Sequence, residues 1–65
     1  MENNIRVLRA VKNISQEQLA QELGVTRQTI HAVETGKYNP SLDLAFKMAR
    51  FFDKSIEEIF IYDDG

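Results

Sequence analysis

The sequence contains no cysteine and no tryptophan, and it has one proline and one histidine among its 65 residues. Without cysteine, neither a disulfide framework nor a thiolate metal site can form, and a lone histidine does not make a zinc site. No apolar run approaches the roughly 18 residues of a membrane-spanning helix, and the N-terminus has no signal-peptide pattern. We therefore expect a soluble, cytoplasmic protein with no metal, no cofactor, no small-molecule ligand and no membrane contact.

The residue patterns of enzymes are also missing. The sequence has no Ser-His-Asp or Cys-His arrangement, no glycine-rich phosphate loop and no metal-ligand spacing, and its 65 residues are too few to enclose a typical substrate pocket. The length predicts a single domain over residues 1–65, with little buried surface and marginal stability alone. An enzyme is not expected, and a second copy of the chain is the expected source of further stability.

An excess of positive charge is absent as well, since the net charge is −2, which taken alone argues against nucleic-acid binding. The charges are unevenly distributed, however. Residues 5–38 carry five Lys and Arg against three Glu, whereas residues 39–65 carry three Lys and Arg against six Asp and Glu. We expect the acidic C-terminal part to face away from DNA, and non-specific affinity to be modest because phosphate neutralisation supplies it.

Caps, turn residues and apolar spacing predict five helices. Capping boxes are expected at Ser15 with Gln18 and at Ser55 with Glu58. Further caps are expected at the asparagine pair 3–4, Thr26 and Ser41, and glycines 24 and 36 are expected to end helices. The expected helices are Asn4–Lys12, Gln16–Leu23, Arg27–Thr35, Leu42–Phe52 and Ile56–Ile59.

Apolar residues at helical spacing predict the inward face of each longer helix. The expected core positions are Ile5, Leu8, Val11, Leu19, Ala20, Leu23, Ile30, Val33, Leu42, Ala45, Met48, Ala49 and Phe52.

The segment from Ser15 to Gly36 is the most informative part of the chain. It predicts two short helices joined by a tight turn, which is the sequence form of a helix-turn-helix. The second helix keeps a polar face that no core requires, made by Arg27, Gln28 and His31. Arginine can bond guanine and glutamine can bond adenine through two hydrogen bonds each. The alternative is that these are ordinary solvated side chains on a surface helix.

The chain resembles the phage repressor and Cro family, also called the XRE family, from about Ile5 to Phe60. The segments ISQEQLA, VTRQTI, ETGKYNPSL and LAFKMA carry the likeness. Within the family, the cytolysin-operon repressor group is the most similar, because RQTI and KYNPSL recur together there. The resemblance implies an all-α, lambda-repressor-like five-helix bundle over about residues 5–60, with a small antiparallel sheet added by a short C-terminal strand.

The resemblance also implies roles for individual residues. Arg27 and Gln28 match positions that read base edges, and Gln16 matches a phosphate contact. Thr26 caps the helix and is a further candidate for a thymine methyl or a phosphate, while His31 is a candidate donor to bases or a solvated residue. Ala32 departs from phage repressors that have glutamine there. The remaining implied residues are the phosphate contacts Thr35, Lys37, Tyr38 and Asn39, with Tyr38 packing on the fourth helix as an alternative, and the ion pair Arg9–Glu34.

A surplus of apolar residues near the C-terminus predicts a dimer interface. Leu44, Phe46 and Phe51 exceed what one buried helix stripe can hide. Residues 60–62 are strong β-formers, and three arrangements stay open for them: pairing with a symmetry mate, pairing with the N-terminus, or a frayed tail. The expected interface is Leu44, Phe51, Phe60, Ile61 and Tyr62, with residues 60–65 as tail or dimer strand.

Together these patterns predict a sequence-specific, double-stranded DNA-binding transcription regulator. The expected form is a repressor that binds a palindromic operator as a homodimer through the major groove. The alternative is a protein-interaction module, such as an antitoxin-type helix-turn-helix protein, which the acidic C-terminal part favours.

Overall fold

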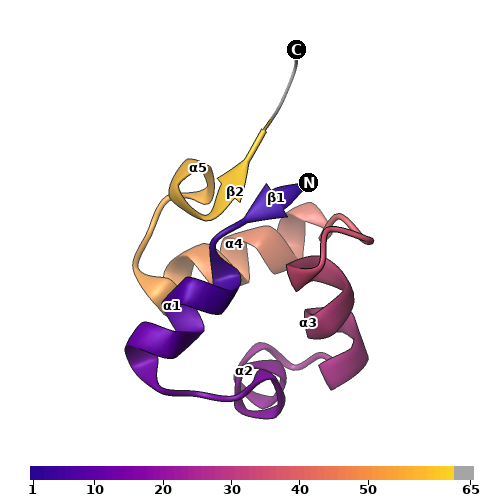
Figure 1. Cartoon of the computed structure of the whole chain (residues 1–65), viewed down its shortest axis with the longest axis vertical. Coiled ribbons are helices and arrows are strands. Elements are labelled where there is room, and N and C mark those ends of the chain that lie inside the picture. Colours follow the sequence, from indigo (N-terminus) through magenta and orange to yellow (C-terminus); the bar gives the residue numbers. More distant parts are fainter. Residues whose placement is uncertain (63–65) are drawn as a thin grey trace.

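The computed structural model describes residues 1–62 and contains five helices and two short strands (Figure 1). The predicted all-α, five-helix fold is confirmed, and each helix end lies within one residue of its predicted position. The order is β1 Glu2–Asn3, α1 Ile5–Lys12, α2 Gln16–Leu23, α3 Arg27–Glu34, α4 Leu42–Phe52, α5 Ile56–Ile59 and β2 Phe60–Ile61.

Side-chain caps begin four of the helices. The Ser15 hydroxyl accepts from the Gln18 backbone at 3.0 Å, and the Gln18 side chain accepts from the Ser15 backbone at 2.8 Å. The predicted second box at the start of α5 is also present. Thr26 caps α3 and Ser41 caps α4 through the same type of hydroxyl bond. Because each cap satisfies helix N–H groups that lack an internal partner, these boundaries are locally encoded.

Three helices end in a left-handed residue. Gly24 ends α2 with φ of 71°, as predicted. Asn13 and Asp53 end α1 and α4 with φ of 57° and 55°. The predictions did not assign these two roles, although Asn and Asp tolerate the left-handed region better than other side chains.

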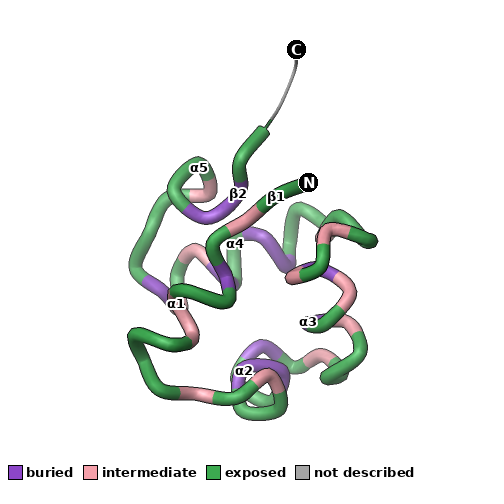
Figure 2. Tube along the Cα trace, viewed as in Figure 1, coloured by how far each residue is buried: buried purple, intermediate pink, exposed green. Residues whose placement is uncertain are grey.

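The core lies where the five helices meet, and Figure 2 shows the buried segments turned toward this centre. The most fully buried large side chains come from every helix and are Ile5, Leu19, Ile30, Val33, Met48 and Ile59. No polar or charged residue is fully buried within residues 1–62. Apolar packing therefore holds the bundle together, and the polar and charged side chains lie at or near the outer surfaces of the helices.

The structure corrects four predictions of burial. Val11 and Leu42 were expected inside, but both are exposed, Leu42 by 69%. Leu44 and Phe60 were expected at a dimer interface, but they are only 6% and 7% exposed and belong to the core. Residues two apart on a helix point about 200° apart, so Leu42 and Leu44 cannot both face inward. Leu44 joins the buried row of Met48 and Phe52, which turns Leu42 outward.

The two strands pair with each other in an antiparallel ladder, Glu2 with Ile61 and Asn3 with Phe60. The Asn4 backbone N–H extends this contact by donating to the Ile59 carbonyl at 2.8 Å. The predicted C-terminal strand is thus present, and its partner is the N-terminus of the same chain. Residues 63–65, the rest of the expected tail, lie outside the described part of the chain.

Within residues 1–62, no helix is both long enough and apolar enough to cross a membrane. In the same range, no group of three or more His, Cys, Asp or Glu side chains is arranged to hold a metal ion.

Candidate nucleic-acid interface

The turn between α2 and α3 is closed by local hydrogen bonds. The Val25 amide reaches back to the Ala20 carbonyl at 3.0 Å, after Gly24 has reversed the chain. The Thr26 hydroxyl then accepts from the Thr29 amide at 3.2 Å and starts α3. Buried Ala20 is small, which allows α3 to approach α2 closely. The relative orientation of the two helices is consequently set by a short, hydrogen-bonded turn.

Arg27, Gln28 and His31 lie on the outer side of α3, and all three are exposed. Their spacing places them on one face of the helix. Together they line a shallow hollow of about 230 Å³. The structure therefore brings together three of the four residues predicted to contact bases and exposes their side chains to solvent.

Gln16, the first residue of α2, reaches across to α3. Its side-chain nitrogen lies 3.4 Å from His31 Nδ1 and 3.4 Å from Glu34 Oε1. The predicted phosphate contact and the predicted helper residue are thus neighbours. Because Gln16 is half-buried and held between two α3 side chains, its position depends on that of α3.

Arg9 and Glu34 form the ion pair that joins α1 to α3. Arg9 Nε lies 2.6 Å from Glu34 Oε2, and Arg9 Nη2 lies 3.1 Å from Oε1. Arg9 Nη1 also donates to the Ile14 carbonyl at 3.0 Å. The two side chains are only 16% and 6% exposed, and the hydrogen bond to Glu34 raises the pKa of Arg9 despite its partial burial. This two-bonded geometry orients α3 against the bundle.

The two threonines at the ends of α3 differ in their free hydrogen-bonding capacity. Thr35 Oγ1 lies 3.0 Å from the His31 carbonyl and 3.2 Å from the Ala32 carbonyl, so its proton is used inside the helix. The Thr26 hydroxyl accepts from the helix and lies 3.0 Å from the Thr29 hydroxyl, either of which can donate. A phosphate contact by Thr35 requires its hydroxyl to leave these carbonyls, whereas the Thr26 hydroxyl keeps its proton available when Thr29 is the donor in their bond.

The loop after α3 folds back on the end of the helix. The amides of Lys37 and Tyr38 donate to the Ala32 carbonyl at 3.0 and 3.2 Å. Lys37, Tyr38 and Asn39 are exposed next to this anchored turn. Tyr38 is 51% exposed, so half of its surface is covered by the protein and half remains available to a ligand.

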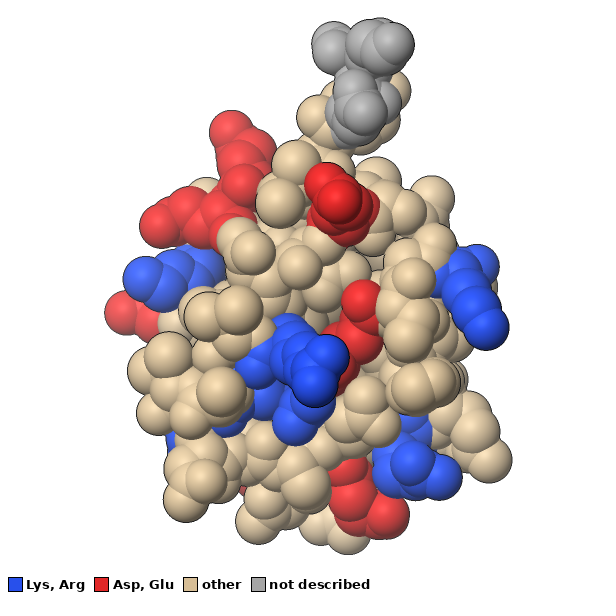
Figure 3. Space-filling view, in the orientation of Figure 1, with Lys and Arg blue, Asp and Glu red and all other residues tan. Residues whose placement is uncertain are grey.

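The charge of the molecule is divided in space as well as in sequence. In Figure 3, Lys and Arg side chains lie over α1 and beside both ends of α3, whereas Asp and Glu gather around α5 and also lie beside β1 and α2. Glu34, the acidic residue of α3, is occupied by Arg9 and Gln16. The face that presents Arg27 and Lys37 is therefore more favourable to a polyanion than the net charge indicates.

A second exposed surface is apolar. Leu42 and Phe46, one turn apart on α4, are 69% and 52% exposed. A groove of about 300 Å³ runs from Leu42 to Met1, Ile56 and Phe60. Met1 also adjoins Ile61 and Tyr62, both exposed. We call Met1, Leu42, Phe46, Ile61 and Tyr62 the α4 face.

Phe51 does not belong to the α4 face. Its ring packs edge-on against Phe52 at 5.1 Å between centroids, and the Lys12 amine lies 5.3 Å from the ring centre. It borders a different hollow, formed with the end of α2. Of the apolar residues from which an interface was predicted, Phe46, Ile61 and Tyr62 lie on the α4 face.

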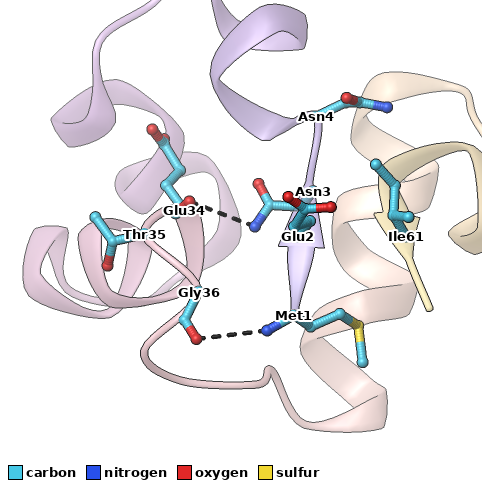
Figure 4. Close-up of a pocket in the computed structure, with 8 residues that line it drawn as sticks. All are labelled: Met1, Glu2, Asn3, Asn4, Glu34, Thr35, Gly36 and Ile61. Atoms are coloured by element: carbon cyan, nitrogen blue, oxygen red, sulfur yellow. Dashed lines mark hydrogen bonds between the residues drawn. The ribbon is translucent and has the colours of Figure 1, made fainter. Parts of the chain in front are cut away.

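Sequence reasoning gave Asn3 a cap role and missed its contact with α3. Its side-chain nitrogen donates to the Val33 carbonyl at 2.8 Å, which joins β1 to the end of α3. The same nitrogen lies 3.5 Å from the Glu34 carbonyl, the contact drawn in Figure 4. No local pattern signals this bond, because 30 residues separate its partners.

Two capped helices, a closed turn between them and an exposed polar face on the second define a helix-turn-helix DNA-binding module. A family model described as helix-turn-helix matches residues 5–59. The chain therefore belongs to this helix-turn-helix (XRE) family of transcription regulators, which bind DNA and are not enzymes.

Similar proteins support this assignment. The chain is 59% identical to an uncharacterized HTH-type transcriptional regulator of Methanocaldococcus jannaschii, over 98% of this chain and 97% of that protein. The solved structure of a hypothetical transcription factor, NHTF, from Neisseria matches with a TM-score of 0.77 and 34% identity, over 85% of this chain and 62% of that chain.

Two more distant relatives have names that state a direction of regulation. The cryptic phage CTXphi transcriptional repressor RstR of Vibrio cholerae is 35% identical, over 88% of this chain and 51% of that protein. The transcriptional activator BcrR of Enterococcus faecalis is 38% identical, over 85% of this chain and 27% of that protein.

Proposed function

We propose that this regulator is a repressor that binds a palindromic operator in the cytoplasm as a symmetric homodimer. The observation that carries the proposal is the exposed face of Arg27, Gln28 and His31, which directly follows a capped, hydrogen-bonded turn. In proteins with this arrangement, the second helix enters the major groove and residues near its N-terminus contact bases.

Arg27 and Gln28 are the proposed principal base readers. Arg27 is suited to the O6 and N7 atoms of guanine, and Gln28 to the N6 and N7 atoms of adenine. His31 lies one turn further on and acts as a helper, while Thr26 can approach a thymine methyl from the helix start. The hollow that Arg27, Gln28 and His31 share supports a joint role on adjacent base pairs.

Phosphate contacts position the module on either side of these bases. Gln16 is proposed on one side, at the start of α2. On the other side, the anchored loop offers a cation in Lys37, a hydroxyl in Tyr38 and an amide in Asn39. Thr35 joins this set only after its hydroxyl has left the carbonyls of α3.

The α4 face is the proposed two-fold interface. It replaces the interface predicted from sequence, because Leu44 and Phe60 are in the core and Phe51 borders another hollow. Exposed apolar side chains gathered around one groove are typical of contact surfaces. A two-fold dimer implies a palindrome with half-sites about 34 Å apart, one helical turn of DNA.

Repression by covering a promoter is the proposed mode of action, and membership of the cytolysin-operon repressor group is proposed with it. The name of RstR supports this direction and the name of BcrR opposes it. A promoter that carries the selected operator in front of a reporter gene tests it. Lower reporter output with the protein present supports repression, and higher output rejects it.

The experiment that tests DNA recognition is selection from random-sequence duplex DNA, followed by sequencing, at two salt concentrations. We expect a palindrome to be enriched and affinity to fall steeply as salt rises, because bound phosphates release counterions. Enrichment of a single half-site would reject the dimer and keep base reading. No enrichment at either salt would reject sequence recognition and favour the protein-interaction module.

A further inference from the structure

We propose that Asn3 is a positioning residue for DNA recognition, although it lies away from the outer face of α3. Asn3 joins strand β1 to the C-terminal end of the recognition helix. Through β1 it sets the tilt of α3 relative to the α4 face, and hence the half-site spacing that a dimer accepts. This inference rests on the proposed function.

The Asn3 side chain bonds in two directions at once. Its nitrogen donates to the Val33 carbonyl at 2.8 Å and lies 3.5 Å from the Glu34 carbonyl. Its oxygen accepts from the Ile5 amide at 3.1 Å, at the start of α1. Figure 4 shows the side chain extending from β1 toward α3, and it is half-buried there. With both ends of the amide engaged, Asn3 is suited to holding elements together.

The end of α3 receives the Asn3 donor in addition to donors from its own loop. The last four carbonyls of a helix lack internal partners and need donors from elsewhere. The carbonyls of His31, Ala32 and Val33 accept from the amides of Thr35, Lys37 and Gly36 respectively, which are supplied locally. Asn3 adds the short bond at Val33 and the longer one at Glu34. The Asn3 side chain thus supplies the last turn of α3 with a hydrogen-bond donor from a segment distant in sequence.

Strand β1 is itself held firmly between α3 and the C-terminal strand. Asn3 pairs with Phe60, and the following amide donates to the Ile59 carbonyl at 2.8 Å. On the other side β1 lies against the loop after α3, where a side chain on Gly36 would come within 3.3 Å of the Met1 carbonyl oxygen. A connection therefore runs from α3 through Asn3 and β1 to Ile61 and Met1 on the α4 face.

The consequence concerns geometry on DNA. Two recognition helices in a symmetric dimer must enter major grooves about 34 Å apart. A small change in the tilt of α3 relative to the two-fold axis changes that separation. Residues without ligand contact can alter affinity in this way by about twofold to about thirtyfold. Asn3 acts on spacing, whereas Arg27 and Gln28 act on base identity.

The test compares Asn3→Asp with Asn4→Asp. In Asn3→Asp, the carboxylate keeps an acceptor for the Ile5 amide, loses the donor to Val33 and faces the carbonyl end of α3, where negative charge is unfavourable. Asn4→Asp is the matched control. Asn4 is the next residue along the chain, and its substitution changes the charge by the same amount. Its side chain donates to the Glu58 carbonyl of α5 at 3.1 Å, not to α3.

Binding is measured on the operator selected by the wild type and on versions with one base pair added to or removed from the centre. We expect Asn3→Asp to lose about tenfold in affinity for the original spacing and much less for an altered one. We expect Asn4→Asp to keep the wild-type spacing preference. Binding of both variants to random duplex DNA should be equal, because their charges are equal.

A second measurement needs no DNA. Amide hydrogen exchange at Gly36 and Lys37, which bond into the last turn of α3, should be faster in Asn3→Asp than in Asn4→Asp. Should Asn3→Asp fail to fold, Asn3→Ser with Asn4→Ser as its control serves the same purpose. The serine hydroxyl can still accept from the Ile5 amide but is too short to reach Val33.

Equal losses and equal spacing preferences for the two variants would overturn the role of Asn3, even when the wild type selects a palindrome. Unchanged exchange at the end of α3 would overturn it independently. A wild type that selects no sequence would instead reject the proposed function, and the positioning role with it. The two failures are therefore distinguishable.

Discussion

Helices α3 and α4 bury one side in the same core and expose very different opposite sides. Both begin at a hydroxyl cap, and both contribute fully buried residues, Val33 and Ile30 from α3 and Met48 from α4. The outer side of α3 carries exposed hydrogen-bonding groups beginning with Arg27. The outer side of α4 exposes Leu42 and Phe46.

This difference separates two kinds of partner. Polar groups in fixed directions suit base edges, which differ from one another in their donors and acceptors. Exposed apolar side chains gain free energy only when another apolar surface covers them, at about 25 cal/mol per Å². We interpret α3 as the DNA-reading helix and α4 as the self-associating helix, and single substitutions in each region test this division.

The largest expected effect is the loss of the anchor of α3. Glu34→Ala leaves the Arg9 guanidinium largely buried without its partner and also removes a contact of Gln16. We expect unfolding to be easier by about 3 kcal/mol, the lower end for a broken buried pair because Arg9 keeps some solvent. Urea or thermal unfolding measures this. Glu22→Ala, an exposed change on α2, is the control, and an equal effect of the two would contradict an anchoring role.

The next effect falls on base reading. Arg27→Ala should weaken operator binding by about 2 kcal/mol and relax the preference at one base pair, because the bidentate contact is lost. Competition among operator variants measures both changes. Arg6→Ala removes an equal charge from an exposed position of α1 and serves as the control. An equal loss on every sequence would make Arg27 a phosphate contact.

A smaller effect is expected from the α4 face. Leu42→Asp places a carboxylate at the start of α4, where the helix dipole favours it, so the fold should be retained. Self-association should weaken at least tenfold, about 1.4 kcal/mol, while binding to a single half-site stays unchanged. Analytical ultracentrifugation measures the association. Val11→Asp, at an exposed apolar site on α1, is the control, and a larger effect there would move the interface to α1.

The smallest effect concerns pH and the capping box of α5. Hydrogen bonds from the Ser55 backbone and hydroxyl lower the pKa of Glu58. The ionised Glu58 carboxylate therefore stabilises the folded state at pH values above the ordinary pKa of glutamate. This stabilisation should be lost as pH falls below about 4.3 toward the lowered value in the folded state. Glu58→Gln keeps the box without titrating there, and the decline of Tm in acid should become slightly shallower. Glu57→Gln is the control, and a matching change in it would contradict this assignment.

Much of the recognition module could be predicted because its signals are local. Ser15 with Gln18, Gly24 and Thr26 act within a few residues of themselves, and they fixed α2, the turn and the start of α3. Once those boundaries are known, helical spacing places Arg27, Gln28 and His31 on the side opposite Ile30 and Val33. The candidate base-reading surface therefore follows from the amino-acid sequence.

The α4 face could not be predicted in the same way. α4 is rich in apolar residues on several sides, so periodicity alone allows more than one rotation about its axis. Packing chose the rotation that buries Leu44 and turns Leu42 outward. The hydrophobic effect is non-directional, so the shape of the remaining core decides which of several apolar residues is covered.

Local signals specify the five helices, the side-chain caps of four of them and the polar outer side of α3, because short-range hydrogen bonds and helical periodicity are sufficient for these. Tertiary packing instead places Phe60 in the core, pairs β2 with β1 and brings the Asn3 side chain to the end of α3. Those contacts join residues from opposite ends of the chain or from separate helices. Their partners are selected by the packing of the whole bundle, which no local segment encodes.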